Sequence, residues 1–153
     1  SNNITQMINN YGNANMYLSK RAGFTNANLI YMMVNGANTG SIQTTTSGVT
    51  YNTTSDRRLK DNIQPISDAT DKLMDMKPVT HTWIDNPEAP QVHGFIAQEM
   101  QEVIPEAVSG DAESDEMMSM DYGRITPVIV AALQDALKEI KELKTRIDEL
   151  EAM

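Results

Sequence analysis

A heptad pattern near the carboxyl end of the chain limits what this region can pack against. From residue 133 onward, apolar residues recur in alternating steps of three and four, the spacing of a coiled-coil seam. The seam consists of Leu133, Ala136, Ile140, Leu143, Ile147 and Leu150. A stripe this narrow favours a parallel coiled coil between chains. The alternative is a long amphipathic helix that packs along its own domain.

The helix that carries this seam is expected to span residues 127–151. Thr126 is a suitable N-cap, and Pro127 suits the first helical position. Isoleucine at the first core position and leucine at the second favour two strands, but Ala136 weakens that preference. The side-chain pattern alone therefore leaves the number of strands open.

Charge divides the chain near Ser55. Residues 1–54 contain two basic residues, Lys20 and Arg21, and no acidic residue. The other ten basic residues and all 21 acidic residues lie in residues 55–153. The first segment is instead rich in Asn, Thr and Gly. We therefore predict two units, residues 1–54 and residues 55–153.

The first unit shows short strand patterns separated by turns. Strands are expected at residues 29–34, 41–46 and 49–53, with an earlier candidate at residues 15–18. The dipeptide Asn35-Gly36 predicts a tight hairpin turn. So few apolar residues cannot build a core within one chain. This unit is either a disordered Asn/Thr linker or the end of a β-structured fibre in which several chains intertwine.

The second unit alternates short helices and strands, which predicts an α+β fold. Helices are expected at residues 67–76 and 97–103, and strands at residues 79–84 and 92–96. A further short strand at residues 106–108 and an acidic loop precede the long helix. Residues 55–153 should thus form a small α+β domain with a C-terminal helix.

Composition argues against several classes of function. A net charge of −9 argues against nucleic acid as a partner, and no apolar run is long enough to span a membrane. The chain has no Cys and two His, so no metal site is expected. It also lacks the phosphate-binding glycine loops and the Gly-x-Ser-x-Gly turn, so no cofactor is expected.

The one candidate for covalent chemistry lies at the predicted boundary between the units. Ser55 and Lys60 are five residues apart and could meet across a turn. A neutral lysine can deprotonate a serine hydroxyl and so activate it as a nucleophile. Spacing alone is weak evidence, because a Ser-Asp pair before a charged segment is usually a cap or a turn.

Three segments together are similar to a known family. The Thr-Thr-Ser-Asp-Arg-Arg-Leu-Lys run and its continuation occupy residues 53–63, Gly-Phe-Ile-Ala-Gln-Glu occupies residues 94–99, and Pro-Glu-Ala-Val occupies residues 105–108. In this combination they resemble the C-terminal intramolecular chaperone domain of bacteriophage tail fibres and tailspikes. That family includes endosialidase tailspikes and neck appendage proteins. The resemblance extends from Ser55 to the C-terminus, and residues 1–54 resemble the fibre end that precedes such a domain.

The resemblance implies an intertwined homotrimer of the α+β class. It would contain a fibre end like a triple β-helix, a small chaperone domain and a trimeric coiled coil, so it favours three strands over two. The chaperone domain would align three copies of its client, the upstream fibre of the same polypeptide. It would then act as a self-cleaving serine peptidase on the Thr54–Ser55 bond. Ser55 would be the nucleophile and Lys60 the base, and His93 is a candidate supporting residue.

The fibre part would then belong to the virion, and the chaperone part would be released in the host cytoplasm. Two other functions stay open on the sequence alone. One is a structural trimerisation tip that does not cleave itself, and the other is a receptor-binding fibre tip.

Overall fold

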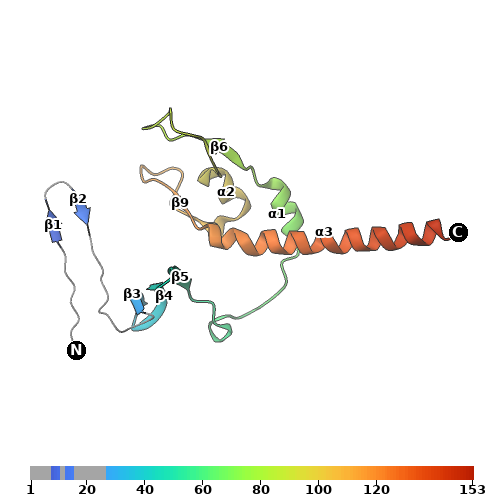
Figure 1. Ribbon diagram of the computed structural model, residues 1–153, viewed down its shortest axis with the longest axis horizontal. Coiled ribbons are helices and arrows are strands. Elements are labelled where there is room, and N and C mark those ends of the chain that lie inside the picture. The colour runs from blue at the N-terminus through green and yellow to red at the C-terminus, as the bar shows by residue number, and fades with distance from the viewer. Residues whose placement is uncertain (1–7, 11–12, 16–26) are drawn as a thin grey trace. The chain divides into compact units, whose positions relative to one another are not determined.

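The computed structural model describes residues 8–10, 13–15 and 27–153, and it divides the chain into two compact units, Ser1–Ile63 and Gln64–Met153 (Figure 1). The strand candidate at residues 15–18 lies almost entirely outside the described residues.

The first unit consists of antiparallel strands. Strand β1 (Ile8–Asn10) pairs with β2 (Asn13–Asn15). A second sheet has the order β3-β4-β5, formed by β3 (Ala27–Val34), β4 (Ala37–Thr44) and β5 (Val49–Thr53). The structure thus forms strands over the three segments of this sheet in which the sequence predicts them.

Two glycines determine how β4 lies between its neighbours. Asn35 and Gly36 have φ angles of 50° and 80°, as in the tight turn of a two-residue hairpin. Because the turn is this short, β4 begins at Ala37 rather than at residue 41. A Cβ atom on Gly40 would lie 2.8 Å from the carbonyl oxygen of Asn52, so only glycine permits this approach of β4 to β5.

This second sheet buries little apolar surface within one chain. Its buried side chain is that of Ser41, whose Oγ accepts a hydrogen bond from Asn52 Nδ2 at 3.2 Å. Most of its large apolar residues are exposed, namely Tyr31, Met32, Met33, Val34, Val49 and Tyr51, whereas Ile30 and Ile42 are half-buried. A three-stranded sheet without an apolar core is marginal alone, so its residues suit an assembly in which other chains cover them.

The chain then forms a short 3-10 turn, η1 (Arg57–Leu59), before it enters the second unit. The second unit contains α1 (Ala69–Asp75), β6 (Val79–His81), β7 (Val92–Gly94), α2 (Ala97–Val103), η2 (Pro105–Ala107), β8 (Val108–Ser109), β9 (Ser119–Met120) and α3 (Tyr122–Glu151). Strands β6 and β7 pair antiparallel, as do β8 and β9. The predicted α+β class is confirmed.

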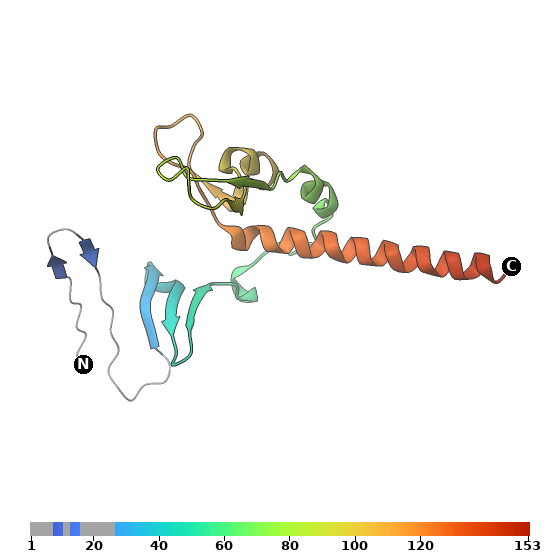
Figure 2. The same cartoon turned by 45° about the horizontal axis from the view of Figure 1, so that its top comes forward.

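The core of the second unit lies between α1, α2, η2 and the first half of α3. Its buried residues are Ala69, Met76, Met100, Ile104, Ala107, Ile125, Val128 and Ala132. The contribution of α3 to this core ends at Ala132, directly before the heptad seam begins at Leu133. Figure 2 shows that the C-terminal half of α3 extends beyond the other elements of its unit.

Helix α3 begins earlier than its sequence signals indicate. The N-cap is Asp121, whose Oδ1 accepts a hydrogen bond from the Gly123 N–H at 2.9 Å, and the helix starts at Tyr122. The expected start at Pro127 is therefore wrong. Burial of Ile125 against the core stabilises the additional turn. Pro127 is tolerated in the second turn, where its missing N–H removes a single helical hydrogen bond.

Two shorter elements also differ from the prediction. The strand expected at residues 79–84 ends at His81, and an isolated bridge between Trp83 and Asn86 closes the turn that follows. Residues 105–107 form η2 with Pro105 at its start, so the expected strand at residues 106–108 is reduced to β8. Among the described helices, none combines the length and apolarity that a membrane crossing requires.

Candidate functional site

Ser55 and Lys60 lie within hydrogen-bonding distance, because η1 turns the chain back on itself. Lys60 Nζ donates to Ser55 Oγ at 2.8 Å. The turn is closed by the Lys60 N–H, which donates to the Arg57 carbonyl at 3.1 Å, and by the Leu59 N–H, which donates to the Asp56 carbonyl at 3.1 Å. Both paired side chains are exposed in the single chain. A local turn thus brings together the two residues that the sequence analysis selected.

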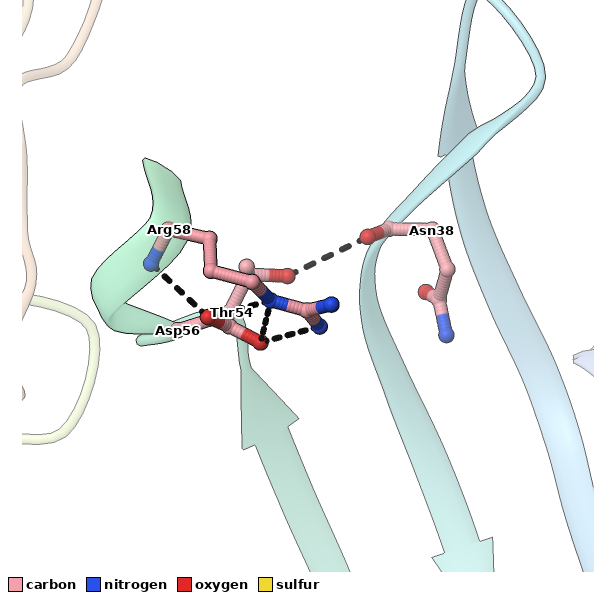
Figure 3. Close-up of polar contacts among 4 residues, drawn as sticks. All are labelled: Asn38, Thr54, Asp56 and Arg58. Carbon is pink, nitrogen blue, oxygen red and sulfur yellow. Dashed lines mark hydrogen bonds and ion pairs between the residues drawn. The ribbon is translucent and has the colours of Figure 1, made fainter. Parts of the chain in front are cut away.

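Asp56 fixes the backbone immediately after Ser55. Its Oδ1 accepts from the Arg58 N–H at 2.8 Å and so caps η1, while Arg58 Nη2 lies 2.7 Å from Oδ2 (Figure 3). The Arg58 guanidinium, and after it the Arg58 N–H, lower the pKa of the Asp56 carboxyl below its ordinary value. Asp56 is therefore ionised near neutral pH. Such an exposed pair contributes little to global stability, but it defines the local conformation.

Thr54 fixes the backbone immediately before Ser55. It follows the last residue of β5 and continues alongside the start of β4. Its N–H donates to the Thr39 carbonyl at 3.2 Å, and its Oγ1 donates to the Asn38 carbonyl at 3.2 Å (Figure 3). Thr54, on the amino side of the Thr54–Ser55 bond, is therefore held to β4 by two hydrogen bonds.

Sequence reasoning missed the residues that hold this segment. Asn38 and Thr39 are far from Ser55 along the chain. They approach it because Gly40 pairs with Thr53 in the β4–β5 register. Asp56, by contrast, can be recognised in the sequence, because aspartate directly before a turn is a preferred N-cap.

His93, the candidate supporting residue, lies in β7 of the second unit. It is opposite Thr80 in the pairing with β6, and its side chain is exposed. Its role in cleavage stays a prediction. In the neighbouring strand, the His81 ring packs edge-on against Trp83 with ring centres 5.2 Å apart. Within the described ranges, no three His, Asp or Glu side chains gather as metal ligands would.

The heptad seam of α3 is an uncovered apolar stripe in the single chain. Its large side chains are between 47% and 69% exposed. They are Leu133, Ile140, Leu143, Ile147 and Leu150. Ala136 is exposed as well. The core of the second unit ends before the seam begins, so the seam is available to a partner.

Comparison with known proteins assigns the segment that begins at Ser55. Residues 55–109 match the family Peptidase S74, described as the chaperone of endosialidase. This segment, about a third of the chain, is therefore similar to the chaperone-of-endosialidase family. The match begins at the residue whose hydroxyl contacts Lys60.

The relatives of known name are phage tail fibre proteins. The chain is 29% identical over 98 residues to the long tail fiber protein Gp37 of Enterobacteria phage K3, which covers 61% of this chain and 8% of that fibre. It is 30% identical over 97 residues to the Gp37 protein of Enterobacteria phage M1, which covers 60% of this chain and 39% of that protein. The chain thus spans well under two thirds of the length of these relatives.

Proposed function

We propose that this chain is an intramolecular chaperone that trimerises a phage tail fibre and then releases itself by cutting the Thr54–Ser55 bond. Its client is the upstream fibre of the same polypeptide. The observation that carries the proposal is the 2.8 Å hydrogen bond from Lys60 Nζ to Ser55 Oγ, located at the first residue of the family match.

The cut follows from the chemistry of a serine that comes directly after the broken bond. Ser55 Oγ attacks the carbonyl carbon of Thr54 and gives its proton to the neutral amine of Lys60. A carbon–oxygen bond forms, the carbon–nitrogen bond breaks, and Lys60 passes the proton to the departing α-amine of Ser55. Water then hydrolyses the ester, which leaves a carboxylate on Thr54 and restores the Ser55 hydroxyl.

Lys60 can accept a proton only as a neutral amine. In the single chain its side chain is exposed, and in the observed contact its Nζ is the donor. Burial disfavours the charged form of lysine. Neighbouring chains that cover η1 in the assembled fibre would therefore favour the base form, so assembly would precede cleavage.

The exposed seam of α3 supports assembly through a parallel coiled coil. From Leu133 to Leu150 it spans about 25 Å of helix, at 1.5 Å per residue. The side-chain pattern leans towards two strands, but Ala136 weakens that preference. The uncovered β3–β4–β5 sheet is a second surface that requires partners, and the sum of all interfaces decides the closed symmetry. Together with the family resemblance, this favours three chains.

A separate trimerisation domain, which acts as a seed for folding, suits a fibre whose contacts join residues far apart in sequence. Aligning three chains costs conformational entropy before any contact between them forms. Chains joined at one end hold the three client segments at high effective concentration. Cleavage then removes the seed from the unfolding path, which leaves the fibre kinetically trapped. The fibre would join the virion, and the cut domain would stay in the host cytoplasm.

The test is the mass of the purified full-length chain and of its Ser55→Ala variant. We expect the unmodified chain to yield fragments 1–54 and 55–153. We expect Ser55→Ala to remain intact yet trimeric, because only a hydroxyl is removed. A fragment that begins at residue 55 in the variant would refute the nucleophile. An uncut unmodified chain would instead indicate the structural trimerisation tip.

A further inference from the structure

Ser55 lies between two anchors that belong to different parts of the first unit. On its amino side, Thr54 is bonded to β4, and on its carboxyl side, Asp56 caps η1. We propose that these anchors hold the Thr54–Ser55 peptide bond in the geometry of attack, with the Thr54 hydroxyl and the Asp56 carboxylate as positioning residues. This inference rests on the proposed self-cleavage.

The amino-side anchor controls the electrophile. Strand β5 ends at Thr53, so the next peptide group would turn freely if nothing held it. The Thr54 N–H instead donates to the Thr39 carbonyl. The Thr54 hydroxyl donates to the carbonyl of the preceding residue, Asn38 (Figure 3). Two bonds to one strand restrict rotation of the residue whose carbonyl carbon must face Ser55 Oγ.

The carboxyl-side anchor controls the base. Lys60 reaches Ser55 because η1 reverses the chain within a few residues, and Asp56 caps that turn. Its carboxylate accepts from the Arg58 N–H at 2.8 Å and pairs with the Arg58 guanidinium. Without this cap, η1 loses the bonds that fix its first residues, and the direction of the Lys60 side chain is no longer defined.

The two anchors therefore act on the two groups that must meet. Neither one takes part in bond making, so their loss should slow cleavage without removing the nucleophile or the base. A displacement of about 1 Å between reacting groups can lower a rate about 100-fold. We expect about ten-fold to 100-fold slower cleavage when either anchor is removed.

The experiment measures the rate at which fragments appear from full-length trimers isolated by size exclusion. Thr54→Val, which keeps the shape and removes the hydroxyl, should be slow, whereas Thr54→Ser should cut at nearly the unmodified rate. Thr53→Val is the matched control, because the Thr53 hydroxyl has no hydrogen-bond partner in the described part of the chain. Equal rates for Thr54→Val and Thr54→Ser would overturn the role of the Thr54 hydroxyl.

The second anchor has its own pair of variants. Asp56→Ala should be slow, and Asp56→Asn should recover much of the rate, because its amide oxygen can still accept from the Arg58 N–H. This pair decides the inference if Thr54→Val does not assemble. An Asp56→Ala trimer that cuts at the unmodified rate would overturn the carboxyl-side anchor.

Hydroxylamine distinguishes positioning from the later chemistry, because it cleaves an ester that water hydrolyses slowly. The anchors act before the ester forms, so hydroxylamine should not accelerate the slow variants. Acceleration by hydroxylamine would place the defect in hydrolysis and overturn the inference. If the unmodified chain stays intact, the proposed function fails and the anchors fail with it. If Ser55→Ala stays intact while Thr54→Val and Asp56→Ala cut at the unmodified rate, the proposed function stands and the anchors alone fail.

Discussion

Replacing Ile140 and Ile147 together by Asp tests the coiled coil that the seam of α3 predicts. These side chains are 47% and 52% exposed in the single chain. Full burial of an isoleucine stabilises by about 1.5–3 kcal/mol, so burial of the exposed half should contribute about 1 kcal/mol per side chain. A trimer contains each residue three times, and the double variant should therefore lose about 6 kcal/mol per trimer.

The new carboxylates increase this loss. Each of the two layers would hold three like charges near the axis, and taking unpaired charges out of water costs several kcal/mol more. A loss of about 6 kcal/mol alone lowers the assembly constant about 10⁴-fold. The double variant should therefore be monomeric at concentrations where the unmodified chain is a trimer.

Light scattering after size exclusion measures both masses. The matched control is Gln134→Asp with Thr145→Asp, which adds the same charge to exposed positions of α3 outside the seam and should remain trimeric. A dimer mass for the unmodified chain would refute the trimer, and a trimeric seam variant would refute the burial argument. A monomeric seam variant that still cuts efficiently would show that cleavage does not need assembly.

Two further substitutions address the cleavage site. Lys60→Arg keeps the charge and can still donate to Ser55, but arginine does not deprotonate, so we expect a loss of about 10²-fold to 10⁴-fold in cleavage rate. Arg57→Lys is the matched control. A near-normal rate for Lys60→Arg would show that Lys60 only orients Ser55. Gly40→Ala places a methyl group 2.8 Å from the Asn52 carbonyl oxygen, so it should separate β4 from β5 at the anchors of Thr54 and slow cleavage. The measurements are the rate at which fragments appear and the amide hydrogen exchange of β5. Unchanged values of both would contradict the close approach.

The sequence predicts best the features that depend on neighbouring residues. The Asn35-Gly36 turn, the strands beside it and helix α2 all follow from local patterns. The Ser55–Lys60 contact belongs to the same group, because a turn of a few residues is sufficient to form it. Asn38 could not be found in this way. It approaches Thr54 through the β4–β5 register, and that register depends on a hydrogen-bonded ladder rather than on any local signal.

Helix α3 shows why a cap motif can place a boundary wrongly while the periodicity remains informative. Thr126 and Pro127 form a good start signal, but Asp121 offers another, and burial of Ile125 and Val128 decides between them. Up to Ala132 the buried face of α3 packs against its own unit, and from Leu133 the apolar residues are those of the seam together with Leu137, all exposed in the single chain. Helix α3 thus has a face buried in its own unit, followed by an apolar seam that is exposed in the single chain. A helix that packed only within its own chain would have no reason to continue its apolar stripe for five turns beyond its core. The change at residues 132–133 is therefore the strongest physical argument, independent of family, that the chain functions as an assembly.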